Sequence, residues 1–384
     1  MPHNHGSGEG VSGFALRFAA ALAALVAGCQ GPASAPARPD VAATSPPASS
    51  HLASGPRVPV ITQQVYLDGL ALPVGLQFAP DGRLFFAEVN KGQVRVVEGG
   101  VLRTEPFATL QVAQGQEHGL LGLTLDPRFA ENGYLYAYYT VPTRSGKPDF
   151  NRVVRLTDRN GGGTDTKVIL DKIPADVKGS HNGGRMLFGP DGKLYVATGI
   201  RGDEATGSQQ PKALEGKILR LEPDGSVPSD NPVPNSPVYA LGLRNPYGIA
   251  FHPKTARLYA IDNGPKGYDE LNLIRPGGNF GWPTVMGASG DARFVDPLWQ
   301  SGPERLGLSG LAFYTGGQLD EYQGDLFFCL WNTGTMRRVR LAAPDYERIE
   351  QMEDLAVDCR LDVANGPDGA LYTAGITQIH RLGR

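Results

Sequence analysis

The chain has 384 residues, of which 41% are hydrophobic and 20% charged, so its composition is that of a folded protein without a disorder signature. Its formal net charge of -3 argues against a nucleic-acid partner, because such proteins usually carry a basic excess. The 51 Gly and 31 Pro predict many short strands joined by turns.

The N-terminus has the pattern of a targeting segment. Residues 14–26 form an apolar run that is too short to span a bilayer, and it ends in Val26-Ala27-Gly28-Cys29, which resembles a bacterial lipoprotein signal. We therefore expect a signal peptide at residues 1–28, acylation of Cys29 and a disordered Ala/Pro/Ser-rich tether at 29–56. The predicted location is periplasmic or cell-surface, with the lipid as the sole membrane attachment. The alternative is an ordinary signal peptide with a chance cysteine.

The three cysteines suggest one disulfide. When Cys29 is set aside, Cys329 and Cys359 remain as a pair in an exported, oxidising setting, which favours a bond between them. Two buried free thiols are the alternative.

A short pattern recurs along residues 57–384: a reverse turn, often Pro-Asp-Gly, followed by a strand of alternating aromatic and aliphatic residues. Pro presets the first φ of such a turn and Gly accepts the positive φ that follows. The copies begin at Ala79, Asp126, Gly189, His252, Tyr322 and Gly366.

Six copies at intervals of roughly 45 to 70 residues indicate a repeat architecture, and each interval has room for one four-stranded blade. The expected fold is all-β: a six-bladed β-propeller with four-stranded antiparallel blades. Glycine-rich strands ahead of the turns, such as Val74-Gly-Leu-Gln-Phe, suit the crowded position nearest the axis. The last copy is too short for a blade, so residues 65–72 are expected to complete it. Two stacked β-sandwiches would explain neither the repeat nor its count.

Several segments are not needed to build strands. These are Ser180-His-Asn-Gly-Gly-Arg185, Leu243-Arg-Asn-Pro-Tyr-Gly248, Asn263-Gly-Pro-Lys-Gly-Tyr-Asp-Glu-Leu-Asn272 and Gly277-Gly-Asn-Phe-Gly-Trp-Pro283. They lie beside predicted inner strands at loop positions, so we expect them to converge at one end of the channel.

At these residues the chain resembles the soluble quinoprotein sugar dehydrogenases, the glucose/sorbosone and aldose dehydrogenases that use pyrroloquinoline quinone (PQQ). The resemblance runs from about Val74 to Leu382. It implies that His181 is the general base that removes a sugar hydroxyl proton while hydride leaves for the quinone. Arg244 would face the cofactor as a cation, Asn245 would donate its amide beside it, and Glu117 would bind a sugar hydroxyl.

The resemblance also implies two Ca²⁺ sites. The carbonyls of Gly264 and Pro265 would hold a cofactor-linked ion, and Asp269, Glu270 and the carbonyl of Phe280 a structural one. Oxygen ligands of this kind suit calcium.

The chain departs from the glucose-dehydrogenase branch where that branch binds the PQQ carboxylates. Trp331 or Asn332 stands where the branch has Lys, and Cys359 and Leu361 stand at the two Arg places. Trp331 and Arg360 are the substitutes expected to contact the cofactor here.

These observations predict a PQQ- and Ca²⁺-dependent dehydrogenase that acts on an aldose or related polyol and passes electrons to an external acceptor. The alternative from another class is a non-catalytic propeller that binds a glycan or protein at its mouth. A metal-dependent lactonase is a third, but it needs several inward-facing acidic ligands, which the sequence does not show.

Overall fold

The structure, a computed structural model, describes residues 61–202 and 206–384, which form β-sheet with only short helical turns. The predicted signal peptide (1–28), Cys29, the whole predicted tether (29–56) and residues 57–60 lie outside the described residues. Among the described residues, no helix is both long and apolar enough to cross a membrane.

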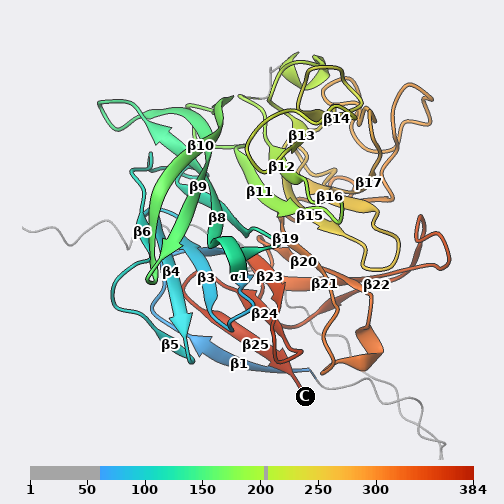
Figure 1. Ribbon diagram of the computed structural model, residues 1–384. Coiled ribbons are helices and arrows are strands. Elements are labelled where there is room, and N and C mark those ends of the chain that lie inside the picture. Colours follow the sequence, from blue (N-terminus) through green and yellow to red (C-terminus); the bar gives the residue numbers. More distant parts are fainter. Residues whose placement is uncertain (1–60, 203–205) are drawn as a thin grey trace, which may run out of the picture. The chain divides into compact units, whose positions relative to one another are not determined.

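The strands form six antiparallel sheets, each of which is a blade of a propeller (Figure 1). The first blade contains β2 (Pro73–Phe78), β3 (Leu84–Glu88), β4 (Gln93–Glu98) and β5 (Val101–Leu102), with β6 (Ala108–Thr109) paired to β4. The second contains β7 (Leu120–Leu125), β8 (Tyr134–Pro142), β9 (Pro148–Arg159) and β10 (Gly162–Pro174). The third contains β11 (Gly183–Phe188), β12 (Leu194–Thr198), β13 (Lys217–Leu221) and β14 (Val238–Leu241).

The other three blades complete the ring. The fourth blade contains β15 (Pro246–Phe251), β16 (Leu258–Asp262), β17 (Glu270–Ile274) and β18 (Trp299–Gln300). The fifth contains β19 (Leu308–Phe313), β20 (Leu326–Leu330), β21 (Thr335–Leu341) and β22 (Ile349–Leu355). The sixth contains β23 (Asp362–Asn365), β24 (Leu371–Ala374), β25 (Ile379–Gly383) and the N-terminal strand β1 (Thr62–Leu67). The helical turns are α1 (Phe129–Asn132) and two 3-10 turns at Thr206–Gln209 and Asp320–Tyr322.

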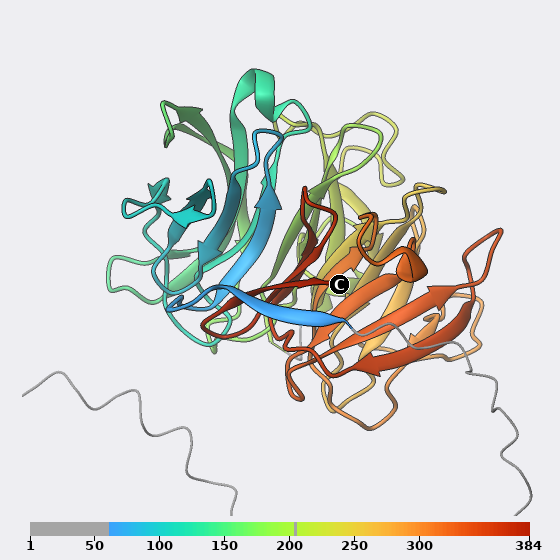
Figure 2. The same cartoon turned by 90° about the horizontal axis from the view of Figure 1, so that it is seen from below.

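The predicted six-bladed propeller is therefore confirmed. The N-terminal strand closes the ring as expected, because β1 pairs with β25 from Thr62 opposite Gly383 to Leu67 opposite Ile379 (Figure 2). This strand starts earlier and ends earlier than the sequence predicted. By pairing with the last blade, it removes an exposed sheet edge.

The repeated turns have the predicted chemistry. In the copy at Gly189, the Asp191 carboxylate accepts the backbone N–H of Lys193 at 3.1 Å, and Gly192 has φ +72°. The copies at Ala79 and Gly366 repeat this arrangement through Asp81 and Asp368. In these three copies the side-chain bond holds the turn that joins the inner strand to the next strand of the blade.

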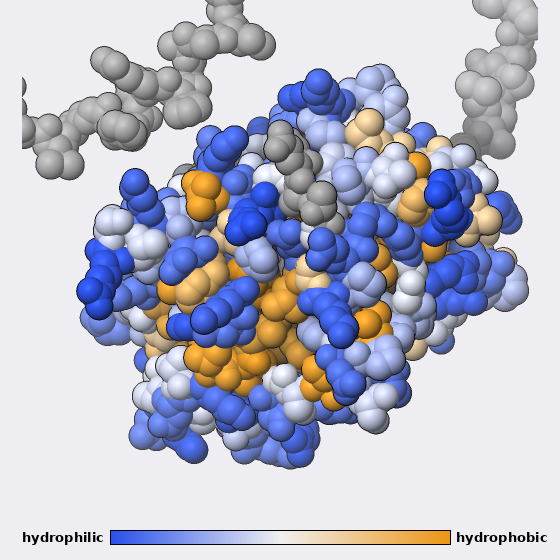
Figure 3. Space-filling model, turned by 90° about the horizontal axis from the view of Figure 1, so that it is seen from above, coloured by the Kyte–Doolittle hydropathy of each residue, from blue (hydrophilic) through white to orange (hydrophobic). Residues whose placement is uncertain are grey.

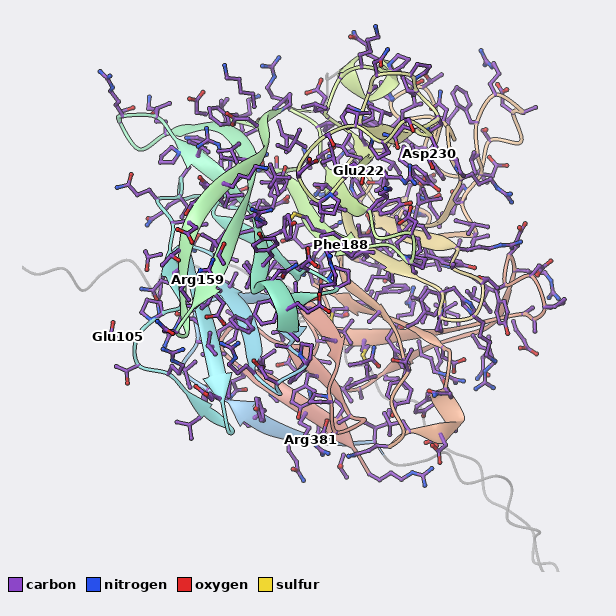
Figure 4. All side chains as sticks on the ribbon, in the orientation of Figure 1. Glu105, Arg159, Phe188, Glu222, Asp230 and Arg381 are labelled. Atoms are coloured by element: carbon purple, nitrogen blue, oxygen red, sulfur yellow. A yellow bond between two sulfur atoms is a disulfide. The ribbon has the colours of Figure 1, made fainter. Side chains whose placement is uncertain are left out.

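The inner strands pack closely around the axis. Each contacts the next around the ring, in the order β2, β7, β11, β15, β19, β23 and back to β2. A Cβ added at Gly122 would lie 2.0 Å from the Gly184 carbonyl oxygen, and one at Gly310 would lie 2.5 Å from Cα of Asp362. Glycine is therefore required for this approach. Figure 4 shows Phe188, the last residue of β11, near the centre, whereas Arg381 and Glu105 lie toward the outside.

A buried ion pair crosses the channel from β11 to the start of β23. Arg185 donates to the Asp362 carboxylate at 3.0 Å and to the Leu361 carbonyl at 2.7 Å. The same carboxylate accepts the N–H of Leu76 at 3.0 Å. Leu361 lines a cavity of about 450 Å³, which we call the mouth cavity, while Arg185 and Asp362 line a second cavity of about 420 Å³, which we call the far cavity. Figure 3 shows apolar side chains gathered inside a polar rim on one face.

Candidate active site

The mouth cavity is built by loops of two kinds, those that connect neighbouring blades and those that connect strands of one blade. Its lining includes His181 before β11, Arg244 and Asn245 before β15, and Gly264 and Pro265 after β16. These are the segments that the sequence predicted would meet at one end of the channel, and the structure brings them together. Glu117, Asp269 and Trp331 also line this cavity.

His181 and Arg244 are in direct contact. Nη2 of Arg244 lies 2.7 Å from Nε2 of His181. A guanidinium can only donate hydrogen bonds, so Nε2 must be the acceptor and the imidazole is neutral in this arrangement. The backbone of His181 has φ +61°, a left-handed conformation that a non-glycine residue adopts only when its surroundings hold it there.

Glu117 holds the His181 backbone in place. Its Oε2 accepts the N–H of His181 at 2.8 Å and the side-chain amide of Asn245 at 3.2 Å. Burial raises the pKa of the Glu117 carboxyl above its usual value, although these hydrogen bonds act in the opposite direction. The sequence proposed Glu117 as a sugar ligand; its position in the lining permits that role, and its contacts also make it a positioning residue.

Arg244 is buried and oriented from several sides. Its Nη1 donates to the carbonyls of Asn263 at 2.8 Å and Gly264 at 3.2 Å. Its guanidinium lies over the ring of Trp282, with Cζ 5.4 Å from the ring centroid. The cation is therefore presented to the mouth cavity in a fixed orientation.

Asp262 holds the backbone of Arg244 and Asn245 in place. Its carboxylate accepts the backbone N–H groups of Arg244 at 2.8 Å and Asn245 at 2.6 Å. Burial, together with the charge of Glu270, raises the pKa of Asp262 to about 7. Asp262 was not predicted as a site residue, because its position in the sequence is that of the last residue of a strand.

Most of the predicted calcium ligands surround one small space. Gly264, Pro265, Glu270 and Phe280 line a cavity of about 20 Å³, and Asp262 lines it too. Burial raises the pKa of Glu270 as well. Calcium prefers oxygen ligands, and the lining of this space contains two carboxyl groups, those of Asp262 and Glu270. In the described part of the chain, however, no three His, Cys, Asp or Glu side chains are grouped to hold a metal ion.

Asp269 does not share this space. Its Oδ1 accepts the N–H of Gly264 at 3.0 Å, and its Oδ2 accepts those of Leu306 and Gly307 at 2.8 and 2.9 Å. The carboxylate thus ties the loop before β19 to the loop after β16.

The fifth and sixth blades meet the cavity through Trp331, Asn332 and Leu361. Arg360 does not line it, since its guanidinium donates to the Trp331 carbonyl at 2.6 Å. The predicted disulfide is present: Cys329 of β20 is bonded to Cys359, with their Cα atoms 4.9 Å apart, and it joins these two blades.

The lining also contains residues that the sequence analysis missed. Arg305, Gln116 and Tyr247 belong to it, and no motif or spacing marks the first two. Tyr247 lies within the Leu243–Gly248 segment already noted, but no role was predicted for it. Loop packing alone brings Arg305 to the cavity.

The fold and site define a class: a six-bladed propeller with a small-molecule cavity at one end of its channel. The sequence profile of the family described as Glucose / Sorbosone dehydrogenase matches residues 70–378, and the chain belongs to that family.

Solved structures agree with this membership. A putative oxidoreductase (glucose dehydrogenase) from Thermus thermophilus has 38% sequence identity and a TM-score of 0.75, covering 84% of this chain and 100% of its own. The PQQ-bound aldose sugar dehydrogenase of Streptomyces coelicolor has 31% identity and a TM-score of 0.72, covering 84% and 98%. Aldose sugar dehydrogenase YliI of Escherichia coli is 28% identical over 340 residues, which are 81% of this chain and 89% of that protein.

Proposed function

We propose that this chain is a PQQ- and Ca²⁺-dependent dehydrogenase that oxidises an aldose or a related polyol and passes the electrons to an external acceptor. The observation that carries the proposal is the His181–Arg244 contact, which lies in the wall of a cavity of about 450 Å³. A base and a fixed cation side by side are what removal of a hydroxyl proton during hydride transfer needs.

The cavity suits a planar anionic quinone. Its volume lies within the usual range for small-molecule sites. Leu72, Val89, Leu121 and Trp331 provide apolar wall for a flat ring system, and Arg244 provides positive charge. These residues would hold the cofactor from its faces and at the His181 end. The carbonyls of Gly264 and Pro265, with Glu270, Asp262 and the Phe280 carbonyl nearby, would hold calcium.

When bound, PQQ supplies a two-electron hydride acceptor. The chain's own part would be that of His181: its Nε2 would take the proton of the sugar hydroxyl while hydride leaves the carbon that bears this hydroxyl, which would give a lactone or another carbonyl product. Arg244 Nη2 donates to that same Nε2 in the structure, so the substrate hydroxyl must replace this contact. Arg244 remains held meanwhile by the carbonyls of Asn263 and Gly264.

The test is reconstitution of the full chain with PQQ and Ca²⁺, followed by dye reduction with a panel of aldoses. Replacing a general base costs about 10²- to 10⁴-fold, so His181→Ala should lose that much turnover. His380→Gln is the matched control, because His380 lies on β25 and does not line the mouth cavity. Calorimetry that detects no PQQ binding at micromolar concentration would remove the proposal.

The second candidate is a non-catalytic propeller that binds a glycan or another ligand at its mouth. The observation in its favour is the uncharged wall formed by Asn332, Trp331 and Leu361. Sugar binding to the PQQ-free protein, without PQQ binding, would select this candidate.

Export, with Cys29 as the lipid attachment site and a periplasmic or cell-surface location, belongs to the same proposal. Its support is the apolar run followed by small residues and cysteine at positions 26–29. Fractionation of a Cys29→Ser variant tests it, since an unacylated chain should leave the membrane fraction.

A further inference from the structure

Two permanent cations line the mouth cavity in the described part of the chain: Arg244 and Arg305. They belong to different loops, since Arg244 precedes β15 and Arg305 precedes β19. Arg244 is committed to the His181 end through its contacts with His181, Asn263 and Gly264. Among the other described side chains that line the cavity, Arg305 carries the only permanent positive charge, so it is the side chain that could pair with an anionic group bound away from Arg244.

The backbone around Arg305 is held on both sides. Asn332 donates its side-chain amide to the Arg305 carbonyl at 2.8 Å, and the N–H of Trp331 donates to the Gly307 carbonyl at 2.8 Å. From the other side, the Asp269 carboxylate accepts the N–H groups of Leu306 and Gly307. The long side chain thus starts from a fixed point directly beside Asn332 and Trp331.

The Arg305 guanidinium is available to a ligand. The residue is exposed, and within residues 61–202 and 206–384 no carboxylate forms an ion pair with it. The Asp269 carboxylate, which anchors this loop, is already engaged by backbone N–H groups. By contrast, Arg337 pairs with Asp354 and Arg338 with Asp325, so neither of those guanidinium groups is available in the same way.

We infer that Arg305 is the second anion-binding residue of the mouth cavity and pairs with a carboxylate of the bound quinone cofactor on the side of Asn332 and Trp331. This inference rests on the proposed function. A planar guanidinium matches a carboxylate in a two-pronged hydrogen bond, which a point charge does not reproduce. Arg305 is a cofactor-binding residue and has no part in proton transfer.

The experiment measures the affinity of the full chain for PQQ by calorimetry, in the presence of Ca²⁺ and at several salt concentrations. Loss of one charge-assisted hydrogen bond should weaken binding at least about tenfold in Arg305→Gln. The salt dependence of the affinity should also fall, because one fewer charge pair is screened. Arg305→Lys should recover part of the affinity, since it keeps the charge without the fork.

Two further variants separate charge from loop structure. Arg293→Gln is the matched control, because Arg293 is an exposed arginine paired with Asp291 outside the cavity, and its affinity should equal that of the wild type. Adding Asn332→Lys to Arg305→Gln places a cation at the neighbouring position and should restore binding in part. If neither Arg305→Lys nor the double variant recovers affinity, the effect comes from the loop and the inference is wrong.

The outcomes also separate this inference from the proposed function. A wild-type chain that binds PQQ while Arg305→Gln binds it equally well overturns the role of Arg305 alone. A wild-type chain that does not bind PQQ overturns the proposed function.

Discussion

Glu117 connects the candidate base to its neighbours through one carboxylate oxygen. Oε2 serves both the His181 N–H and the Asn245 amide, and Asn245 in turn accepts the Gly183 N–H at 3.1 Å. These bonds hold the left-handed backbone at His181, whose φ of +61° is uncommon for non-glycine residues, although histidine adopts it more often than most. The buried Glu117 carboxylate therefore acts on the position of His181 through the His181 backbone N–H.

This arrangement predicts a pH effect on turnover. Because burial raises the pKa of Glu117, the carboxylate gains its proton at a pH above the usual glutamate range and then holds His181 less well. Turnover of the reconstituted enzyme should therefore begin to fall at that pH. Glu117→Gln cannot titrate, so its profile should lack this step while its turnover at neutral pH drops about tenfold through misplacement of the base.

The effect of Glu117 on the stability of the protein should have the opposite pH dependence to its effect on turnover. A raised folded-state pKa contributes stability that is present below the unfolded pKa and is lost as pH rises through the folded one. Thermal melts of wild type and Glu117→Gln across this range measure the difference. An identical pH–turnover profile in both proteins would contradict the role of Glu117.

Residues in contiguous strings were predictable, and residues placed by packing were not. His181, Arg244 and Asn245 lie in short segments with no strand-building purpose, so their position at one end of the channel followed from the repeat. Asp262 is an inward-facing strand end and Arg305 a loop residue, and their roles depend on contacts with Glu270 and Asn332 that no spacing reveals. Arg360 is adjacent to Leu361 but is not part of the lining, and its guanidinium donates to the Trp331 carbonyl.

The hairpin of β15 and β16 is closed by a buried histidine. His252 Nδ1 accepts the backbone N–H of Thr255 at 3.2 Å, and its ring packs against Phe313 and Tyr346 with centroids 4.9 and 4.0 Å apart. Burial, with the charges of Lys254 and Arg257, lowers the pKa of His252. The neutral ring is thus the form that fits between the fourth and fifth blades.

The lowered pKa of His252 predicts that the fold is less stable at acidic pH. A lowered folded-state pKa contributes stability that is present above the unfolded pKa of about 6.5 and is lost as pH falls through the folded value. His252→Asn keeps an acceptor for the turn but does not titrate, so its loss of stability between pH 7.5 and 5 should be smaller than that of the wild type. Urea unfolding at both pH values measures this, and equal losses would contradict it.

The disulfide staples β20 to the segment before β23. Cys329 and Cys359 are 30 residues apart, and closing a loop of this length contributes about 3.6 kcal/mol. The double variant Cys329→Ser with Cys359→Ser should lose roughly that much free energy of unfolding, as should the wild type under reduction. Mass mapping of the native protein that finds both thiols free would contradict the assignment.

At the scale of the whole propeller, the repeat predicted the architecture because each copy combines a turn and an inner strand with fixed roles. Six equivalent blades require a ring, and the short last copy requires a strand from the N-terminal side, which β1 supplies. The crossing contact of Arg185 with Asp362 was not predictable, since it joins opposite blades through residues 177 positions apart. It places a charged partition between the mouth cavity and the far cavity.

We propose that the mouth cavity holds PQQ against Arg244 and His181. A crystal structure of the full chain grown with PQQ and Ca²⁺ tests it most directly. We predict density for a planar tricyclic group within the cavity, with one of its oxygens at hydrogen-bonding distance from the Arg244 guanidinium. An empty mouth cavity at saturating PQQ, or PQQ bound elsewhere on the protein, would contradict the account.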